Sequence, residues 1–290
     1  MEAASRRFVP RSELDAICGG RLAGVRLEGL YVAGSLDALA APTVAIVGTR
    51  TPSDAGRRLA RRLAADLGAA GICVISGLAL GIDGAAHEGS LAARSPTIGV
   101  LGGGHEYFFP SRNRELAARM IAAGGAVVSP YAPDVPARPY QFLARNGVVA
   151  ALADALVVVE AAQRSGALNT ASWAADRAIP VMAFPGDVER VKAAGCLALI
   201  RDGAVLVRDA ADVLAELRIP GGRAEPVARP RDPGSTLGRT IVDRLAREPA
   251  GIDALLEDAR APGAVLACIG ELLGTGIVVE GSDALLRLAP

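Results

Sequence analysis

The sequence predicts an α/β protein with an extended Rossmann-like fold, in which helices cover a mostly parallel sheet, followed by a small winged-helix-like domain. Two observations predict the sheet. Short apolar runs alternate with amphipathic runs between residues 43 and 217, as buried parallel strands alternate with crossover helices. Glycine-centred turns follow three of the apolar runs, where α/β proteins present backbone N–H groups to an anion.

Six short apolar runs are the expected strands of this sheet. They span Val44–Val47, Ile72–Ile75, Thr97–Leu101, Ala126–Val128, Ala155–Val159 and Val181–Phe184. Most positions in these runs are apolar on both sides of the strand, which is typical of a parallel sheet that is covered on both faces.

Six amphipathic segments are the expected helices: Asp54–Ala70, Ile82–Ala93, Asn113–Ala123, Tyr140–Leu152, Leu168–Arg177 and Ala211–Leu217. In the first, Leu59, Leu63 and Leu67 recur at helical spacing and are expected to pack on the sheet. Its opposite face carries the arginines Arg57, Arg58, Arg61 and Arg62. We favour a solvated face for these arginines; the alternative is a basic stripe beside a phosphate site.

The composition changes after the last expected helix of the sheet. Residues 218–235 are rich in proline, glycine and charge, which predicts a linker. Three short helices (Thr236–Arg247, Ile252–Ala259, Gly263–Gly274) and a hairpin (Gly276–Glu280, Ala284–Leu288) follow, the outline of a winged helix-turn-helix. The expected organisation is a short N-terminal segment 1–42, a Rossmann-like domain 43–217, this linker, and a winged-helix-like domain 236–290.

The composition narrows the classes of function. The chain has 290 residues and a formal net charge of zero, so binding to nucleic acid must rest on a local basic patch. Its four cysteines lack metal-ligand spacing and predict no disulfide framework, which favours a reducing compartment. We find no signal peptide and no apolar run long enough to span a membrane. The sequence therefore predicts a cytoplasmic protein with no metal, no cofactor and no membrane partner.

The first expected strand ends in Gly48, Thr49 and Arg50. The glycine lets backbone approach a phosphate closely, while the hydroxyl and the guanidinium supply donors. An ordinary strand-to-helix turn is the alternative. The spaced glycines of a dinucleotide fingerprint and the lysine of a P-loop are missing, which argues against both of those classes.

The second strand ends in Ser76 and Gly77, and Asp83 and His87 follow on the next helix. We expect Asp83 to cap that helix or to hold the loop. Asp83 and His87 are four residues apart, so they could form a catalytic pair, but the sequence positions no nucleophile beside them. We therefore favour a structural Asp–His hydrogen bond.

The third strand ends in Gly102, Gly103 and Gly104. An aromatic stretch that closes with Arg112 and Asn113 follows these glycines. Aromatic rings beside arginine and asparagine suit base stacking next to a phosphate. Alternatively, Phe108 and Phe109 anchor the loop in the core, and we expect this of at least one of them.

Two further segments are candidates for anion contacts. The first gathers arginines, aromatic rings and an amide at Arg138, Tyr140, Phe142, Arg145 and Asn146. The second is a hydroxyl-rich helix start at Ser165, Gly166 and Thr170. Glu160 ends the strand before it and is expected to be structural.

Taken in order, these motifs resemble the DNA-processing protein A (DprA/Smf) family. The motifs are Val47-Gly48-Thr49-Arg50, Ser76-Gly77-Leu78-Ala79, Gly81-Ile82-Asp83, Ala86-His87, Leu101-Gly102-Gly103-Gly104, Pro110 with Asn113, Arg145-Asn146, Val159-Glu160-Ala161, Ser165-Gly166 with Thr170-Ala171, and Pro185-Gly186. The resemblance implies a homodimer that binds single-stranded DNA in a basic pocket and delivers it to the RecA recombinase during natural transformation. It assigns Arg50 to a phosphate contact and places Arg145 in a second contact region.

The chain departs from the family pattern in three places. Gly147 stands where the family has a second arginine, Ser129 is followed by Pro130, and residues 192–197 lack the usual serine and asparagine.

The leading hypothesis is thus a non-enzymatic module that binds single-stranded DNA. The alternative is a nucleotide-binding hydrolase, similar to nucleoside monophosphate phosphoribohydrolases, which would use Glu160. A third interpretation makes the C-terminal domain a reader of duplex DNA. Its expected recognition helix Gly263–Gly274 carries Glu271 and no arginine or lysine, which argues against this role.

Overall fold

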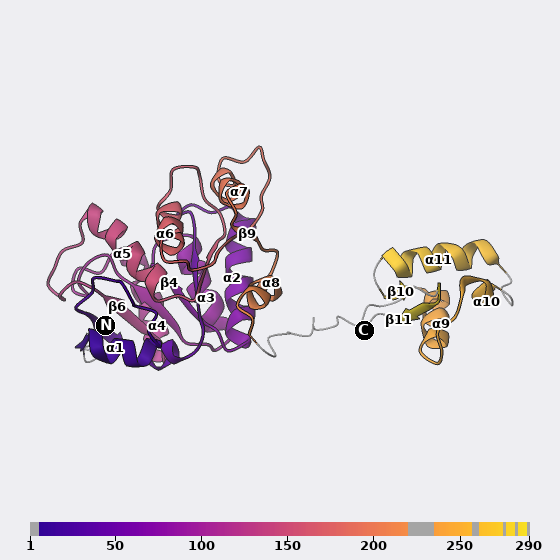
Figure 1. Cartoon of the computed structure of the whole chain (residues 1–290), viewed down its shortest axis with the longest axis horizontal. Helices are drawn as coiled ribbons and strands as arrows, with labels where there is room; N and C mark the ends of the chain where they lie inside the picture. The colour runs from indigo at the N-terminus through magenta and orange to yellow at the C-terminus, as the bar shows by residue number, and fades with distance from the viewer. Residues whose placement is uncertain (1–5, 220–234, 257–260, 275–276, 282–283, 289–290) are drawn as a thin grey trace. The chain divides into compact units, whose positions relative to one another are not determined.

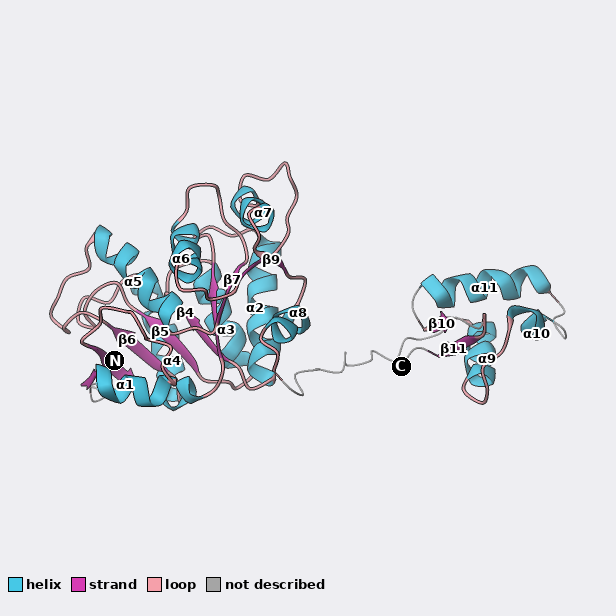
Figure 2. Cartoon of the chain, in the orientation of Figure 1, coloured by secondary structure: helices cyan, strands magenta, loops and turns pink. Residues whose placement is uncertain are grey.

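The computed structural model describes residues 6–219, 235–256, 261–274, 277–281 and 284–288. The chain divides into two compact units, Met1–Ala224 and Glu225–Pro290, each described here by itself (Figure 1). The first unit alternates strands and helices: β1 (Arg7–Pro10), α1 (Arg11–Cys18), β2 (Gly29–Gly34), β3 (Thr43–Val47), α2 (Asp54–Ala69), β4 (Cys73–Ser76), α3 (Ile82–Ala92), β5 (Thr97–Val100), α4 (Arg114–Ala122), β6 (Ala126–Ser129), α5 (Pro139–Ala151), β7 (Ala155–Val158), α6 (Gly166–Ala175), β8 (Val181–Ala183), α7 (Ala194–Arg201), β9 (Val205–Leu206) and α8 (Ala210–Glu216) (Figure 2).

Among the described residues, nine strands form one sheet in the order β1-β2-β6-β5-β4-β3-β7-β8-β9. All neighbours from β6 to β9 pair in parallel, and β1 and β2 pair antiparallel at one edge. This confirms the predicted mostly parallel α/β sheet. The strand order reverses at β3, which has β4 on one side and β7 on the other. Open α/β sheets bind ligands outside the carboxyl ends of the strands at such a reversal.

Both faces of the sheet are covered, which explains why its strands are almost continuously apolar. Val44 and Ile46 of β3 pack beneath α2, α3 and α8, whereas Ala45 and Val47 face α5 and α6. The helix α2 begins where the hydroxyl of Ser53 accepts the N–H of Gly56, an N-cap that satisfies one of the free donors of the first turn.

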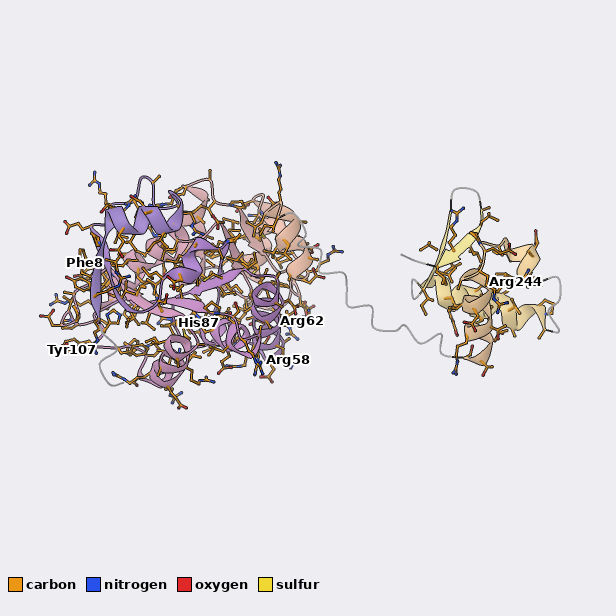
Figure 3. The ribbon with its side chains drawn as sticks, turned by 90° about the horizontal axis from the view of Figure 1, so that it is seen from below. Phe8, Arg58, Arg62, His87, Tyr107 and Arg244 are labelled. Carbon is orange, nitrogen blue, oxygen red and sulfur yellow. The ribbon has the colours of Figure 1, made fainter. Side chains whose placement is uncertain are left out.

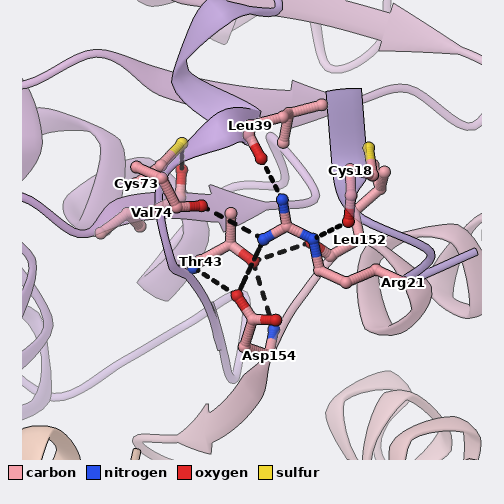
Figure 4. A network of polar contacts seen from close by, with 9 residues as sticks. Cys18, Arg21, Leu39, Thr43, Cys73, Val74, Leu152 and Asp154 are labelled. Atoms are coloured by element: carbon pink, nitrogen blue, oxygen red, sulfur yellow. Dashed lines mark hydrogen bonds and ion pairs between the residues drawn. The ribbon is translucent and has the colours of Figure 1, made fainter. Parts of the chain in front are cut away.

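Residues 1–42, which the sequence sets apart as a separate segment, supply β1, α1 and β2 to the first unit. Arg21 fastens this part to the amino end of the sheet. Its Nη1 lies 2.7 Å from Thr43 Oγ1 and 2.8 Å from Asp154 Oδ2 (Figure 4). The sequence shows no clear periodicity here because β1 is an edge strand with one buried residue in four.

The described residues of the second unit form the helices α9 (Thr236–Leu245), α10 (Ile252–Leu256) and α11 (Pro262–Gly274), followed by the antiparallel strands β10 (Val278–Glu280) and β11 (Leu286–Leu288). Its core contains Ile241, Leu245, Ile269, Leu272 and Leu286. The expected linker lies largely outside the described residues, as do the last residues of the expected helix 252–259 and part of the hairpin turn. The winged-helix assignment stays a prediction. No helix in the described part of the chain has the length and apolar character needed to cross a membrane.

Candidate functional site

A cavity of about 320 Å³ lies outside the carboxyl ends of β3, β4 and β7, where the strand order reverses. Four segments line it: the loop after β3, the loop after β4, the inner side of α5, and the loop that leads into α6. These segments bring three arginines to one place, Arg50, Arg145 and Arg164. The sequence-predicted residues that line it are Gly48, Thr49, Arg50, Gly77, Asp83, Phe142, Arg145, Asn146, Ser165, Gly166 and Thr170.

Backbone contacts on both sides fix the loop that carries Arg50. The N–H of Thr49 donates to the carbonyl of Glu160 at 2.7 Å, and the carbonyl of Thr49 accepts the N–H of Ile82 at 3.2 Å. A Cβ at Gly48 would lie 2.6 Å from Cγ1 of Ile82, so this close approach requires a glycine. The Arg50 side chain stays exposed at the mouth of the cavity.

Glu160 anchors the start of α2 and does not line the cavity. Its carboxylate accepts the Ser53 N–H at 2.9 Å and the Ser53 hydroxyl, and a Cβ at Gly56 would overlap it. Glu160 is therefore placed to position the loop between Arg50 and α2. The hydrolase alternative would use this carboxylate, which lies outside the lining of this cavity.

The loop after β4 is held by a buried charged pair. Asp83 accepts the N–H of Gly77 at 3.1 Å and that of Ala79 at 3.3 Å, and Arg145 donates to the carbonyls of Gly77 and Val100. Burial raises the pKa of Asp83, while Arg145 and the two N–H groups oppose that rise. Burial lowers the pKa of Arg145 to about 10, which leaves it charged at neutral pH.

Asn113 also holds the loop after β4 in place. Its Nδ2 donates to the carbonyls of Leu78 and Ala79 at 2.8 and 3.0 Å. Leu78 has a φ of +54°, which is uncommon for a leucine. Asn113 thus braces a strained turn, whereas the sequence suggests a ligand contact.

Four of the expected ligand contacts are buried in the fold. The hydroxyl of Ser76 donates to the carbonyl of Ile46 at 2.6 Å. A Cβ at Gly102 would lie 2.6 Å from Cδ1 of Phe142, and one at Gly103 would lie 2.7 Å from Ala137. The N–H of Gly104 donates to the carbonyl of Val135 at 2.8 Å. Because these glycines are buried, the structure corrects the expectation that this third glycine turn contacts a ligand: the glycines let Phe142 and the segment 132–137 approach closely.

The expected hydrogen bond between Asp83 and His87 is wrong. Nδ1 of His87 lies 2.8 Å from Oγ1 of Thr97, whose hydroxyl donates to the carbonyl of Val74 at 2.6 Å. The ring is therefore protonated on Nδ1 in its neutral form. Burial lowers the pKa of His87 to about 3, with a smaller contribution from Arg145. His87 supports the sheet and lies outside the cavity lining.

Phe142 lines the cavity, and its ring contacts two arginines and a second aromatic ring. The guanidinium carbons of Arg50 and Arg145 each lie 5.9 Å from its ring centre, and the ring of Phe109 meets its edge at 5.8 Å. Phe108 is buried and Phe109 is 55 % exposed, which confirms that one of the two anchors its loop. Tyr140, two residues before the lining residue Phe142, is 63 % exposed.

The start of α6 closes the opposite side of the cavity. Ser165 is its N-cap and accepts the N–H of Leu168 at 3.4 Å, while Gly166 is exposed. Nδ2 of Asn146 donates to the carbonyl of Gly166 at 3.2 Å, and the buried hydroxyl of Thr170 donates to the same carbonyl at 3.2 Å. Asn146 and Thr170 therefore fix this helix start.

One arginine of the site, Arg164, was missed from the sequence. Phe109, which the sequence offers for base stacking or for anchoring its loop, contacts Phe142 but does not line the cavity. Arg164 is exposed, lines the cavity and comes directly before the N-cap Ser165, a position that could have revealed it. Three predicted contacts, Arg112, Arg138 and Tyr140, are exposed but do not line the cavity. In the described part of the chain, no group of three or more His, Cys, Asp or Glu side chains could hold a metal ion.

The family model described as DNA recombination-mediator protein A matches residues 27–218, a segment that contains every residue lining the cavity. The chain belongs to this family. Protein Smf of Escherichia coli is 40 % identical over 189 residues, which cover 65 % of this chain and 50 % of that protein. DNA processing protein DprA of Bacillus subtilis is 34 % identical over 174 residues, covering 60 % of this chain and 58 % of that protein. The chain thus spans about half the length of the curated relatives it matches.

Two solved structures of DNA processing protein A support the assignment to the DNA recombination-mediator protein A family. That of Streptococcus pneumoniae gives a TM-score of 0.67 at 34 % identity, covering 73 % of this chain and 74 % of that one. That of Helicobacter pylori, described for its single-stranded DNA binding mode, gives a TM-score of 0.64 at 26 % identity and covers 74 % of this chain and 96 % of that one.

Proposed function

We propose that this member of the DNA recombination-mediator protein A family binds single-stranded DNA, without sequence preference, in the cavity at the carboxyl ends of β3 and β7. The observation that carries the proposal is that three arginines and the aromatic ring of Phe142 line a single cavity, with Arg50 and Arg145 each 5.9 Å from that ring. The related structure from Helicobacter pylori, described for its single-stranded DNA binding mode, supports this choice of ligand.

The arginines have different tasks in this proposal. Arg50 and Arg164 are exposed and can form charge-assisted hydrogen bonds with phosphate oxygens. Arg145 is only 4 % exposed and donates to backbone carbonyls, so it positions the loop after β4 and adds positive charge beneath the strand. The exposed Gly166 at the start of α6 offers backbone N–H groups to a further phosphate.

Phe142 and its neighbours supply base contacts. Stacking of a base on an aromatic ring stabilises a bound strand by about 1–3 kcal/mol and tolerates any base. Phe142, the exposed edge partner Phe109 and the exposed Tyr140 are the rings available for it. Because phosphate contacts and stacking carry no sequence code, we expect binding that is tolerant of sequence and weakened by salt.

The wider role follows from the family. We propose that the chain acts in the cytoplasm as a homodimer and passes the bound strand to the RecA recombinase during natural transformation or recombination. The Rossmann-like unit would hold the strand, and the winged-helix-like unit would serve in contacts with proteins. We propose binding without catalysis, because Asp83 and Glu160 are both committed to the backbone around the cavity.

Fluorescence anisotropy with labelled oligothymidylate, in competition with unlabelled single strands and duplexes of equal length, tests the proposal. We expect single strands of any sequence to compete well and duplexes to compete poorly. Equal competition by the duplex, or no binding of oligothymidylate at low salt, would contradict it.

A further inference from the structure

The outer face of α2 carries four arginines that the cavity does not use. We call Arg57, Arg58, Arg61 and Arg62 the α2 arginine face; all four are exposed, while the opposite side of the helix is buried against the sheet. Figure 3 shows two of them, Arg58 and Arg62, along the helix. None of the four side chains forms a hydrogen bond or an ion pair with another described residue.

The four arginines lie next to one another on the helix, and two exposed acidic residues of α2 flank them. Asp54 lies four residues before Arg58 and Asp66 four residues after Arg62, but neither forms an ion pair with an arginine in the described part of the chain. Arg57 and Arg61 are four residues apart, as are Arg58 and Arg62, and like charges at this spacing on a helix repel each other. On the neighbouring α8, Asp212 is already paired with Arg208 at 2.7 Å. With four arginines and two aspartates, α2 has an excess of positive charge within a chain whose net charge is zero, and bound anions would relieve the repulsion between the arginines.

The α2 arginine face closely follows the cavity loop along the chain. The helix begins at Asp54, four residues after Arg50, and the contacts of Ser53 with Glu160 hold the intervening loop in place. Arg62 lies five residues after Arg57, which corresponds to about 7.5 Å along the helix axis. This corresponds to about two phosphates at the rise of a stacked strand.

We propose that the α2 arginine face is a second binding surface, which holds the phosphates of a single strand after it leaves the cavity past Arg50. The inference rests on the proposed function of the cavity. A single strand is the occupant we favour because the loop that carries Arg50 leads from the cavity into this helix, and because arginine forms bidentate contacts with phosphate. The cavity would then hold a short strand by itself, and only a longer strand would reach α2.

Length-dependent binding of oligothymidylate to the full chain tests this proposal. The variant Arg58→Gln/Arg62→Gln removes two charges from the face, and Arg94→Gln/Arg119→Gln removes two exposed arginines elsewhere as a matched control. Each protein is titrated with a strand of about 6 nucleotides and one of about 20 across a salt series. Thermal unfolding checks that all three proteins are equally folded.

We expect the α2 variant to bind the short strand as the wild type does and the long strand about ten-fold more weakly. For the long strand, the slope of log affinity against log salt should fall in magnitude by about 1.4, which corresponds to two lost single-strand phosphate contacts. The control should match the wild type on both strands. Unchanged binding of the long strand, or equal weakening on both strands, would overturn the proposal. Failure of the wild type to bind either strand would instead reject the function of the cavity, and this proposal with it.

Discussion

Asp83 and Arg145 hold the same residue, Gly77, by its two backbone groups. Asp83 accepts the N–H of Gly77 at 3.1 Å, and Arg145 donates to its carbonyl. Both charged side chains are buried, and each favours the charged form of the other. The pair therefore fixes the loop after β4 and places a positive charge beneath the proposed strand.

This arrangement predicts strong coupling between the two side chains. Replacing Arg145 by Met leaves the carboxylate of Asp83 buried without its counter-charge, which is expected to lower the free energy of unfolding by about 3–5 kcal/mol. The double variant Asp83→Asn/Arg145→Met should lose less than the sum of the two single losses. Urea unfolding of the four proteins in a double-mutant cycle measures this. Strictly additive losses would show that the pair is not coupled.

Gly77 has no room for a side chain between these partners. A Cβ there would lie 2.7 Å from both Nη1 of Arg145 and Oδ2 of Asp83, so Gly77→Ala should lower the free energy of unfolding by about 1–3 kcal/mol. Gly84→Ala on α3 is the matched control, because its Cβ would meet nothing closer than 3.6 Å and alanine favours a helix. Chemical denaturation should rank Gly84→Ala at or above the wild type and Gly77→Ala below it. The reverse order would contradict the role given to this contact.

Two exposed aromatic rings on one loop provide a test of base stacking. Phe109 meets the edge of Phe142, whereas Tyr107 is similarly exposed and has no ring contact among the described residues. Phe109→Leu should weaken binding of oligothymidylate by about 1–3 kcal/mol without changing its salt dependence, because stacking releases no counterions. Tyr107→Leu should bind as the wild type does. Equal loss in both variants would argue for a general effect of the loop.

His87 makes stability depend on pH. Burial lowers its pKa from 6.5 to about 3, so between these values the unfolded chain binds a proton that the folded chain does not. The stability that His87 supports is complete above pH 6.5 and declines as the pH falls toward 3. Between pH 7.5 and pH 5.5, wild type should lose about 1.4 kcal/mol more than His87→Gln in free energy of unfolding. A constant difference between the two proteins would show that His87 titrates normally.

The sequence was sufficient for the central sheet. β3 to β8 and their helices lie within one or two residues of the predicted ranges, because strands covered on both faces leave uninterrupted apolar runs. β1 and β2 were not predicted. β1 is a short, exposed edge strand that contains Pro10, so it leaves no apolar run in the sequence. α7 was missed as well, because residues 192–197 carry neither a clear cap nor a regular polar face.

The sequence predicted where the site lies but not what several of its side chains do. The glycine turns at Gly48 and Gly77 do lie at the cavity, since the carboxyl ends of parallel strands share one edge of the sheet. Gly102 looks the same in sequence, yet the ring of Phe142 from α5 lies against it. The burial of Arg145 and the Thr97 partner of His87 likewise depend on contacts between distant segments. A single sequence does not show such contacts.

Arg50 is proposed to contact a phosphate of the bound strand, and binding measured across a salt series tests this most directly. Binding of labelled oligothymidylate and of a matched duplex is measured for the wild type, Arg50→Ala and the exposed control Arg138→Ala, which lies outside the cavity lining. We predict that the wild type prefers the single strand and that Arg50→Ala weakens this binding by about 1.5–3 kcal/mol. We also predict that the slope of log affinity against log salt falls by about 0.7 in Arg50→Ala and stays unchanged in Arg138→Ala. Single-strand binding that is absent at low salt, or that is unchanged in Arg50→Ala, would contradict the account.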